Sequence, residues 1–445
     1  MIPRPQALAR PGPLAARYAE VRAQTEALAA PLSEADCQPQ SMADASPVKW
    51  HLAHVTWFFE TFVLEPHEAG FAPFHPAFRV LFNSYYNAVG AKHPRPQRGL
   101  VTRPGLAEVR QYRRAVDARM AALLQRAAHD AALAVQLEPL VALGLHHEQQ
   151  HQELILTDLK HLLSLNPLEP AYQARWPLAP VVAAAPLAWV AHDGGLVEIG
   201  HDAAAGGFAF DNETPRHRAW LRPFEIGSRP VTHGEWAEFL ADGGYREARW
   251  WLSAGWDWVQ QQAIEAPLYW RRDGSPDDWS VFTLHGRVPL DAHTPVVHVS
   301  LYEADAYARW RAAADPRCRG ARLPTEAEWE HAAAPHAAAG IAAGLFLDSG
   351  ALHPMPAARA PEPGVPAQLY GEVWQWTSSA YLPYPGYQPW AGAVGEYNGK
   401  FMVDQTVLRG GSCASPRSHL RASYRNFFPA GTRWQFAGLR LARDL

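Results

Sequence analysis

The sequence is poor in cysteine, with three in 445 residues, and Cys37, Cys318 and Cys413 lie far apart along the chain. Such spacing excludes a disulfide framework and a zinc module built on cysteine pairs. Charged residues are also scarce, at 19%, and 40 Lys and Arg nearly balance 44 Asp and Glu. A net charge of −4 provides no field for a polyanion, so we expect no nucleic-acid partner.

Long apolar runs are absent as well. No stretch of 18 apolar residues occurs, and the N-terminus shows no apolar segment of signal-peptide length. We therefore expect a soluble, cytoplasmic protein that does not associate with membranes; the oligomeric state stays open. What is abundant is histidine (21 residues) together with 18 Trp, 15 Tyr and 17 Phe, side chains that build metal sites and pockets for flat or cationic ligands.

The first part of the chain, residues 1–165, predicts a bundle of four helices. They are expected at 14–30, from a Ser46 cap to about 64, at 106–127, and at 131–163, with Pro139 marking a kink or a late start of the fourth. Between the second and third helices lies an irregular stretch from 66 to 104, whose many aromatic residues favour an ordered loop.

The remaining chain has a different character. Residues 166–186 are rich in Ala and Pro and predict a linker, and residues 187–445 predict a loop-rich α+β domain. Within it we expect short strands such as 196–200 and brief helices at 303–312 and 325–334. The predicted fold class is therefore multidomain, a helical domain followed by an α+β domain.

A candidate metal site combines the second and fourth predicted helices. His147 and His151 are four residues apart and share one helical face, while the second helix offers His51 and His54. Three neutral imidazoles from two helices would leave up to three coordination positions open for substrate and dioxygen. Zinc is a competing occupant, because three histidines and a water also form a catalytic zinc site. Ligand type alone does not decide between the metals.

The order of these motifs resembles a known family. Residues 50–54 (WHLAH), 84–86 (SYY) and 147–151 (HEQQH), followed by an aromatic-rich domain, are similar to the sulfoxide synthases of ergothioneine and ovothiol biosynthesis. The resemblance implies a DinB-like bundle joined to a domain of the formylglycine-generating-enzyme type, which has a C-type-lectin-like fold. Further matching segments in the second domain are 210–215, 322–330, 371–377, 409–412 and 436–440.

The resemblance also assigns roles in the first domain. It implies that His54, His147 and His151 bind a mononuclear iron(II), with His51 as a neighbour. Gln150 matches the position that hydrogen-bonds the substrate imidazole, although a solvated helix residue is the simpler interpretation. Tyr85 and Tyr86 match the tyrosine pair of the cysteine-using bacterial branch, in which a phenol supplies a proton or an electron.

The implied acceptor substrate is hercynine, the trimethylated betaine of histidine, and dioxygen is the implied oxidant. Members that use γ-glutamylcysteine carry Asp and Arg where this chain has Phe428 and Thr432, so free cysteine is the expected donor, with Arg95 or Arg98 binding its carboxylate. A trimethylammonium group offers no hydrogen to donate and is recognised by aromatic rings. The residues implied to bind hercynine are Trp376, Glu396, Tyr397, Asn426, Phe427 and Phe428.

Several alternatives stay open. Selenoneine synthases, which join a selenosugar to hercynine, resemble the same branch, and no sequence criterion separates the two; an ovothiol-type enzyme would attack histidine itself. A zinc-dependent thiol transferase would use the same bundle without consuming oxygen. A lectin-like binding module with a decayed metal site is a further possibility. A formylglycine-generating oxidase is disfavoured, because it needs two nearby cysteines for copper and Cys413 has no partner in the sequence.

Overall fold

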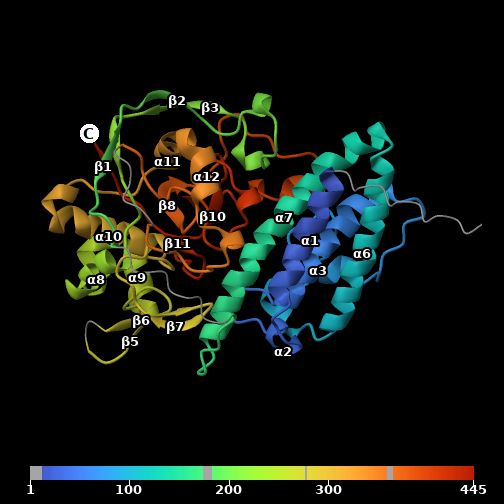
Figure 1. Ribbon diagram of the computed structural model, residues 1–445, viewed down its shortest axis with the longest axis horizontal. Coiled ribbons are helices and arrows are strands. Elements are labelled where there is room, and N and C mark those ends of the chain that lie inside the picture. The colour runs from blue at the N-terminus through green and yellow to red at the C-terminus, as the bar shows by residue number, and fades with distance from the viewer. Residues whose placement is uncertain (1–12, 174–182, 276–277, 358–363) are drawn as a thin grey trace, which may run out of the picture. The chain divides into compact units, whose positions relative to one another are not determined.

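The computed structural model describes residues 13–173, 183–275, 278–357 and 364–445 (Figure 1). The chain divides into two compact units, Met1–Ile155 and Leu156–Leu445. This division falls inside one helix, α7 (Ala131–Ser164), which continues without interruption from the first unit into the second. The predicted linker 166–186 lies partly outside the described residues, and its bounds stay a prediction.

Four long helices dominate the described residues of the first unit (Figure 1). Their ends lie within about two residues of the predicted ones, because apolar periodicity and local end signals are readable from sequence. The exception is the second helix, where α3 ends at Phe59 and a π-helical turn, η1 (Glu60–Leu64), covers the rest of the predicted range. The helices of this unit are α1 (Pro13–Ala29), α2 (Glu34–Cys37), α3 (Val48–Phe59), α4 (Glu65–His67), α5 (Phe78–Leu81), α6 (Leu106–Ala127) and α7, with a 3₁₀ turn η2 (Arg95–Leu100). The stretch 66–104 is otherwise irregular, as predicted.

One detail of the predicted helices is resolved by the structure, and one is wrong. Helix α7 runs through Pro139, so it does not begin late; the buried side chains of Leu137 and Val141 on either side hold it against the bundle. Ser46 does not cap α3, where Pro47 occupies the N-cap position without a side-chain hydrogen bond. Instead the Ser46 hydroxyl accepts a hydrogen bond of 2.9 Å from the buried guanidinium of Arg98.

A buried ionic network ties the four long helices together. The Glu148 carboxylate on α7 accepts from Arg22 of α1 at 2.9 Å and from Arg113 of α6 at 3.1 Å. Arg22 also donates to the hydroxyl of Thr56 on α3, at 2.9 Å. Burial by itself raises the pKa of Glu148, but the two guanidinium groups lower it, so the group is ionised. Because a buried charge without partners is costly, this network fixes the rotation of each helix about its own axis.

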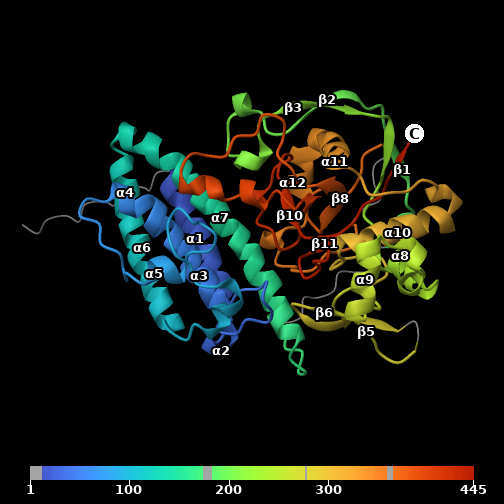
Figure 2. The same ribbon diagram turned by 180° about the vertical axis from the view of Figure 1, so that it is seen from behind.

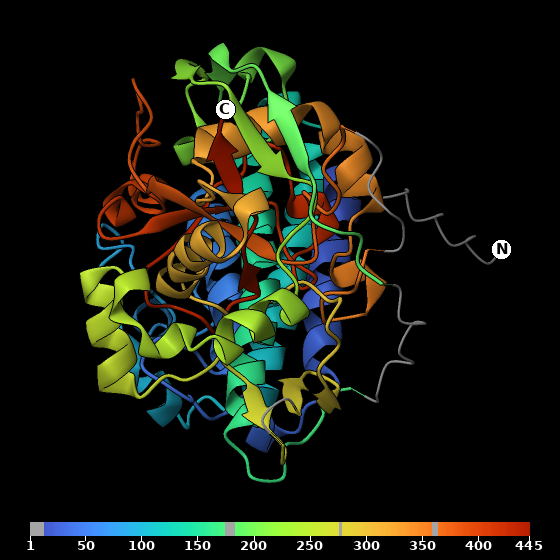
Figure 3. The ribbon, with the colours of Figure 1, turned by 90° about the vertical axis from the view of Figure 1, so that its left-hand side faces the viewer.

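The second unit combines short strands, helices and loops, seen from behind in Figure 2 and from the side in Figure 3. Its described strands form sheets in the orders β1-β4-β12, β10-β9-β8-β11, β5-β6-β7 and β2-β3. All neighbours are antiparallel except β8 and β11. The strands are β1 (Trp189–His192), β2 (Gly195–Ile199), β3 (His217–Leu221), β4 (Phe224–Gly227), β5 (Trp270–Arg272), β6 (Trp279–Thr283), β7 (Gly286–Pro289), β8 (Trp374–Ala380), β9 (Thr406–Arg409), β10 (Asn426–Phe428), β11 (Ala437–Gly438) and β12 (Ala442–Asp444).

Three of the five described helices of this unit, α8, α10 and α11, begin at capping boxes. Ser300 and Glu303 form a capping box at α10, and Thr325 and Glu328 form another at α11. The helices are α8 (His233–Ala241), α9 (Ser253–Gln262), α10 (Leu301–Ala314), α11 (Glu326–Ala333) and α12 (Ala337–Ala343). The prediction of a helical domain followed by an α+β domain is confirmed. None of the helices in the described part of the chain has the length and apolar character needed to span a bilayer.

Candidate metal centre

Three histidine side chains of the first unit converge on one point. His54 comes from α3, and His147 and His151 from consecutive turns of α7. Each offers one ring nitrogen, and these three nitrogens all lie within 4.8 Å of one another. All three side chains are buried. Three lone pairs aimed at one point, with little water around them, are what a metal ion requires of a protein.

The orientation of the His54 ring is fixed from three sides. Its Nδ1–H donates to the backbone oxygen of Phe82 at 2.6 Å, which leaves Nε2 buried and without a hydrogen-bond partner. The ring stacks between two indoles of the same helix, those of Trp50 at 4.5 Å and Trp57 at 5.6 Å between centroids. The free nitrogen therefore faces the cluster without any metal being needed to hold it there.

The other two histidines approach each other closely. Nε2 of His147 and Nε2 of His151 are 3.1 Å apart. Two nitrogens that are neighbouring ligands of one ion, each about 2.1 Å from it, are separated by about 3 Å. The residues present therefore fit a bound cation. On its far side the His151 ring meets His51 of α3, with 2.8 Å between the two Nδ1 atoms.

The electrostatics keep these imidazoles neutral. Burial lowers the pKa of His147 to about 3, and burial followed by the neighbouring imidazoles holds the pKa values of His54 and His151 well below the usual range. A neutral imidazole has the free lone pair that a metal needs, so protons do not compete for this site near neutral pH. Three neutral nitrogen ligands suit iron(II) and zinc alike, and both leave positions for further ligands.

The tyrosine pair lies in a cluster of aromatic side chains of the first unit. Tyr86 is 1% exposed, and its ring contacts those of Trp57 and Phe62 at 5.6 and 5.0 Å. The half-buried Tyr85 packs against it with 4.7 Å between centroids. Trp57 in turn stacks on His54, so one indole separates the Tyr86 ring from a histidine of the cluster. Phe62 belongs to a π-helical turn, η1 (Glu60–Leu64), that follows α3 directly.

The two arginines of the loop differ in their surroundings. Arg95 is exposed and donates to the backbone oxygen of Asp44. Arg98 is 4% exposed, lies 3.4 Å above the Trp50 ring, and donates to the hydroxyls of Ser46 and Ser84. Arg98 thereby links Ser84, which precedes the tyrosine pair, to Ser46 before α3 and to the Trp50 ring that stacks on His54. Gln150, between the two α7 histidines, is half-buried.

The candidate hercynine residues all lie in the second unit. Asn426, Phe427 and Phe428 form β10, an edge strand, and all three are half-buried. Asn426 on β10 and Trp376 on β8 pair with the same residue, Leu408, of the strand between them, β9. Trp376 is fully buried, and its indole N–H donates to the backbone oxygen of Val299. The remaining contacts are a stack of Phe427 on Tyr381 at 4.0 Å, a stack of Tyr397 on Phe210 at 5.3 Å, and an ion pair of Glu396 with Lys400 at 2.8 Å.

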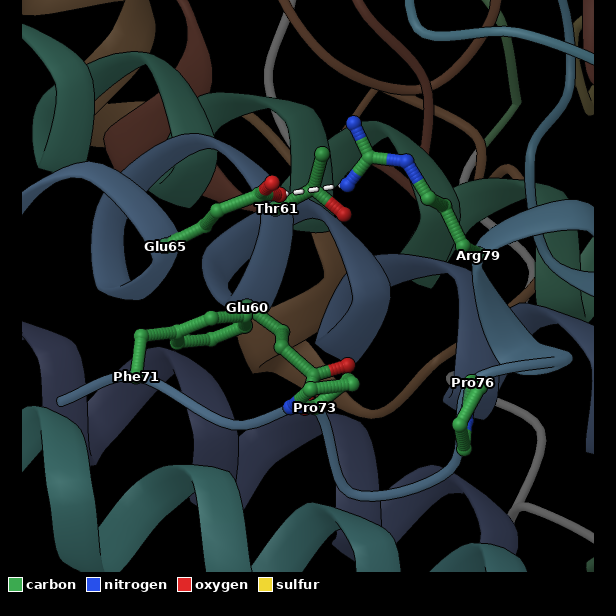
Figure 4. Close-up of a pocket in the computed structure, with 7 residues that line it drawn as sticks. All are labelled: Glu60, Thr61, Glu65, Phe71, Pro73, Pro76 and Arg79. Atoms are coloured by element: carbon green, nitrogen blue, oxygen red, sulfur yellow. Dashed lines mark hydrogen bonds and ion pairs between the residues drawn. The ribbon is translucent and has the colours of Figure 1, made fainter.

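A separate pocket of about 280 Å³ lies on the first unit, beside the π-helical turn (Figure 4). Its lining includes Glu60, Phe71 and the ion pair of Glu65 with Arg79. Both oxygens of Glu60 already accept hydrogen bonds, from the Phe74 N–H at 2.8 Å and from the Tyr112 hydroxyl at 2.6 Å. Because its charged groups are satisfied within the protein and no histidine of the cluster lines it, we assign no ligand to this pocket.

Sequence reasoning missed some of the groups that surround the cluster. The indoles of Trp50 and Trp57 were readable, because positions four before and three after His54 share its helical face. The Phe82 carbonyl had no such signal, since every residue carries a backbone oxygen. The contact between His51 and His151 depends on how two helices face each other, which local spacing does not specify.

Two family models match the chain. The model of the DinB superfamily covers residues 17–155, and the model described as a sulfatase-modifying factor enzyme 1-like domain covers residues 183–445. Together they bear out the expected combination of domains, a DinB-type helical domain followed by a domain of the formylglycine-generating-enzyme type.

Three curated relatives extend this result. A hercynine oxygenase of Mycolicibacterium thermoresistibile is 35% identical over 427 residues, covering 90% of this chain and 88% of the relative. A hercynine oxygenase of Mycobacterium tuberculosis is 35% identical over 459 residues, covering 98% and 99%. Ergothioneine biosynthesis protein 1 of Schizosaccharomyces pombe is 28% identical over 249 residues, covering 53% of this chain and 28% of the relative.

Proposed function

Because the chain belongs to the family of the hercynine oxygenases, we propose that it is an iron(II)- and dioxygen-dependent enzyme of ergothioneine biosynthesis. In this proposal the C2–H bond of the hercynine imidazole and the S–H bond of cysteine are broken and a carbon–sulfur bond forms between C2 and the sulfur. One atom of dioxygen becomes the oxygen of the product, hercynylcysteine sulfoxide, and the other leaves as water, so that the two substrates supply all four electrons. The observation that carries the proposal is the convergence of three buried ring nitrogens within 4.8 Å.

The first unit supplies the metal ligands and a source of protons. His54, His147 and His151 would hold the ion, which when bound would supply open coordination positions and would pass electrons from the substrates to dioxygen. A thiol brought to such a site loses its proton more easily, and placing both reactants together converts separate encounters into one oriented event. The Tyr86 hydroxyl, or that of Tyr85, donates a proton to the reacting oxygen. Gln150 orients the substrate imidazole.

Substrate recognition is divided by charge in this proposal. The carboxylate of cysteine pairs with Arg95 or Arg98, a geometry for which guanidinium groups are suited. The trimethylammonium of hercynine is held by Phe427 and Phe428, with Asn426, Glu396 and Tyr397 completing its surroundings. We propose that Trp376 supports this strand from the core, because it is fully buried and its N–H is already bound.

A parallel donor assay tests the reaction. Protein purified without oxygen is analysed for metal, loaded with iron(II), and given hercynine with cysteine, γ-glutamylcysteine or a selenosugar. Oxygen uptake and product masses are then recorded. The expected result is oxygen-dependent formation of the cysteinyl sulfoxide. A product with the selenosugar alone would replace the proposal with a selenoneine synthase, and turnover by zinc-loaded protein without oxygen uptake would replace it with a thiol transferase.

The tyrosine role has its own test. The Tyr86→Phe variant keeps the ring that packs on Trp57 and Phe62 but loses the proton donor. We expect oxygen to be diverted toward oxidation of the thiol, so that less hercynine is converted per oxygen consumed. The ratio of sulfoxide to oxidised thiol measures this partition, and Tyr85→Phe tests the alternative donor in the same assay. An unchanged ratio in both variants would remove the tyrosines from the mechanism.

A further inference from the structure

His51 lies behind one of the three converging histidines. It is 2% exposed and belongs to α3, one helical turn before His54. Its Nδ1 is 2.8 Å from Nδ1 of His151, with 5.1 Å between the two ring centroids. His151 thus engages both nitrogens, Nε2 toward His147 and Nδ1 toward His51.

The chemistry of imidazole assigns the proton in this pair. A neutral imidazole carries one N–H, and a ring that binds a metal through Nε2 carries it on Nδ1. A hydrogen bond between two Nδ1 atoms needs one hydrogen, so His151 Nδ1–H donates and His51 Nδ1 accepts. The same reasoning applies to His54, whose Nδ1–H donates to the Phe82 carbonyl.

We infer that His51 is a positioning residue that holds His151 in its metal-binding tautomer and orientation. This inference rests on the proposed metal-dependent function and adds a residue to it. Outer partners of this kind fix ring orientation, and their loss typically costs 10- to 100-fold in metal affinity. His51 touches the ligand and not the reacting atoms, so its effect passes entirely through His151.

The nature of the acceptors has a second consequence. The acceptors behind His54 and His151 are a backbone carbonyl and a neutral imidazole, both uncharged. A carboxylate acceptor would place negative charge beside the ligand and make it more basic. With uncharged acceptors behind these two ligands, neither acceptor offsets the charge of a bound dication, which favours an anionic ligand such as a thiolate or a selenolate. The carboxylate that acts on the third ligand, His147, is that of Glu148, and it is itself paired with two arginines.

Four variants test the inference by cobalt(II) binding, which does not depend on turnover. Metal affinity is measured by competition with a chelator, and the coordination by the cobalt absorption spectrum. His51→Leu keeps the bulk and removes the acceptor, so its affinity is expected to fall about 10- to 100-fold. His51→Gln offers an amide oxygen and should recover most of the loss. His51→Glu should bind cobalt more tightly than His51→Gln, and its cobalt form should bind azide more weakly.

His146→Leu is the control, because it removes another buried histidine, one that is paired with Arg17. This variant should bind cobalt with the affinity of the wild type.

The outcomes separate the two levels of the proposal. If the wild type fails to bind cobalt or iron, the proposed function is wrong, whatever the variants do. If the wild type binds and His51→Leu binds equally well, the positioning role is wrong and the function stands. Should His51→Leu not fold, the comparison of His51→Gln with His51→Glu decides, because equal metal affinity and equal azide binding in these two would overturn the inference.

Discussion

The middle and the end of helix α7 both bury basic side chains, but the middle gathers several ring nitrogens at one point and the end buries a single amine. In the middle, His147 and His151 converge with His54, while Glu148 beside them is matched by two arginines. Near the end, the fully buried amine of Lys160 hydrogen-bonds Nε2 of His298 at 2.7 Å. The aromatic rings around this amine are those of Tyr269 and Phe436, at 4.8 and 5.1 Å.

The difference shows that burial of basic groups does not by itself make a metal site. Burial lowers the pKa of Lys160 to about 7, as it lowers those of the three histidines. The side chains near Lys160 nevertheless form no such cluster: within the described ranges, the three histidines are the one group of three or more His, Cys, Asp or Glu side chains that could hold a metal ion. Convergence of lone pairs, and not desolvation, distinguishes the two regions.

Removal of one converging histidine should have the largest effect. We expect His54→Ala to lower metal affinity by more than about 100-fold, beyond the loss of an outer partner, and to abolish turnover. His233→Ala is the control, because His233 is also fully buried but belongs to the second unit and hydrogen-bonds the Asp291 carbonyl. Metal content after dialysis distinguishes them. Equal metal content in the two variants would contradict the assignment of the cluster.

The buried ion pairs of Glu148 with Arg22 and Arg113, in the middle of α7, give the next prediction. Glu148→Gln leaves Arg22 and Arg113 buried without their shared carboxylate, and we expect a loss of about 3 kcal/mol in the free energy of unfolding. Asp117→Asn removes a one-third exposed partner of the same Arg22 and should cost less than about 1 kcal/mol. Urea unfolding of both variants measures the difference, and similar losses would show that the network does not organise the bundle.

The buried amine of Lys160, near the end of α7, predicts that the free energy of unfolding depends on pH. The unfolded chain binds a proton at Lys160 up to about pH 10.5, whereas the folded chain releases it near pH 7, so Lys160 makes stability rise with pH between these values. Lys160→Met removes that slope, an effect of about 4 kcal/mol at most. The titratable groups that interact electrostatically with the amine are His233, His298, His353 and Cys413. Unfolding curves from pH 7 to pH 10 measure the difference between the two proteins, and parallel curves would contradict the prediction.

Local patterns in the sequence predicted the fold class and the positions of most helices. Local sequence patterns placed the four long helices and the brief helices that became α10 and α11, because such patterns depend on residues within one or two helical turns. The error at Ser46 arose where a distant partner outweighed a local signal. Arg98, 52 residues away in the chain, donates a hydrogen bond to the Ser46 hydroxyl, which does not cap the helix. Pro139 lies inside α7, where buried side chains on either side of it pack into the bundle.

The candidate site divides in the same way. The spacing of His147 and His151 alone determined that two imidazoles share a helical face, since four residues make about one turn. Spacing left open which histidine of α3 completes the cluster; the family resemblance implied His54, and the tertiary structure brings its ring to the other two. The rotation of α3, set by its contacts with three other helices, turns Nε2 of His54 toward the α7 histidines and places His51 behind His151. Rotation about a helix axis costs nothing locally, so packing between helices had to determine it.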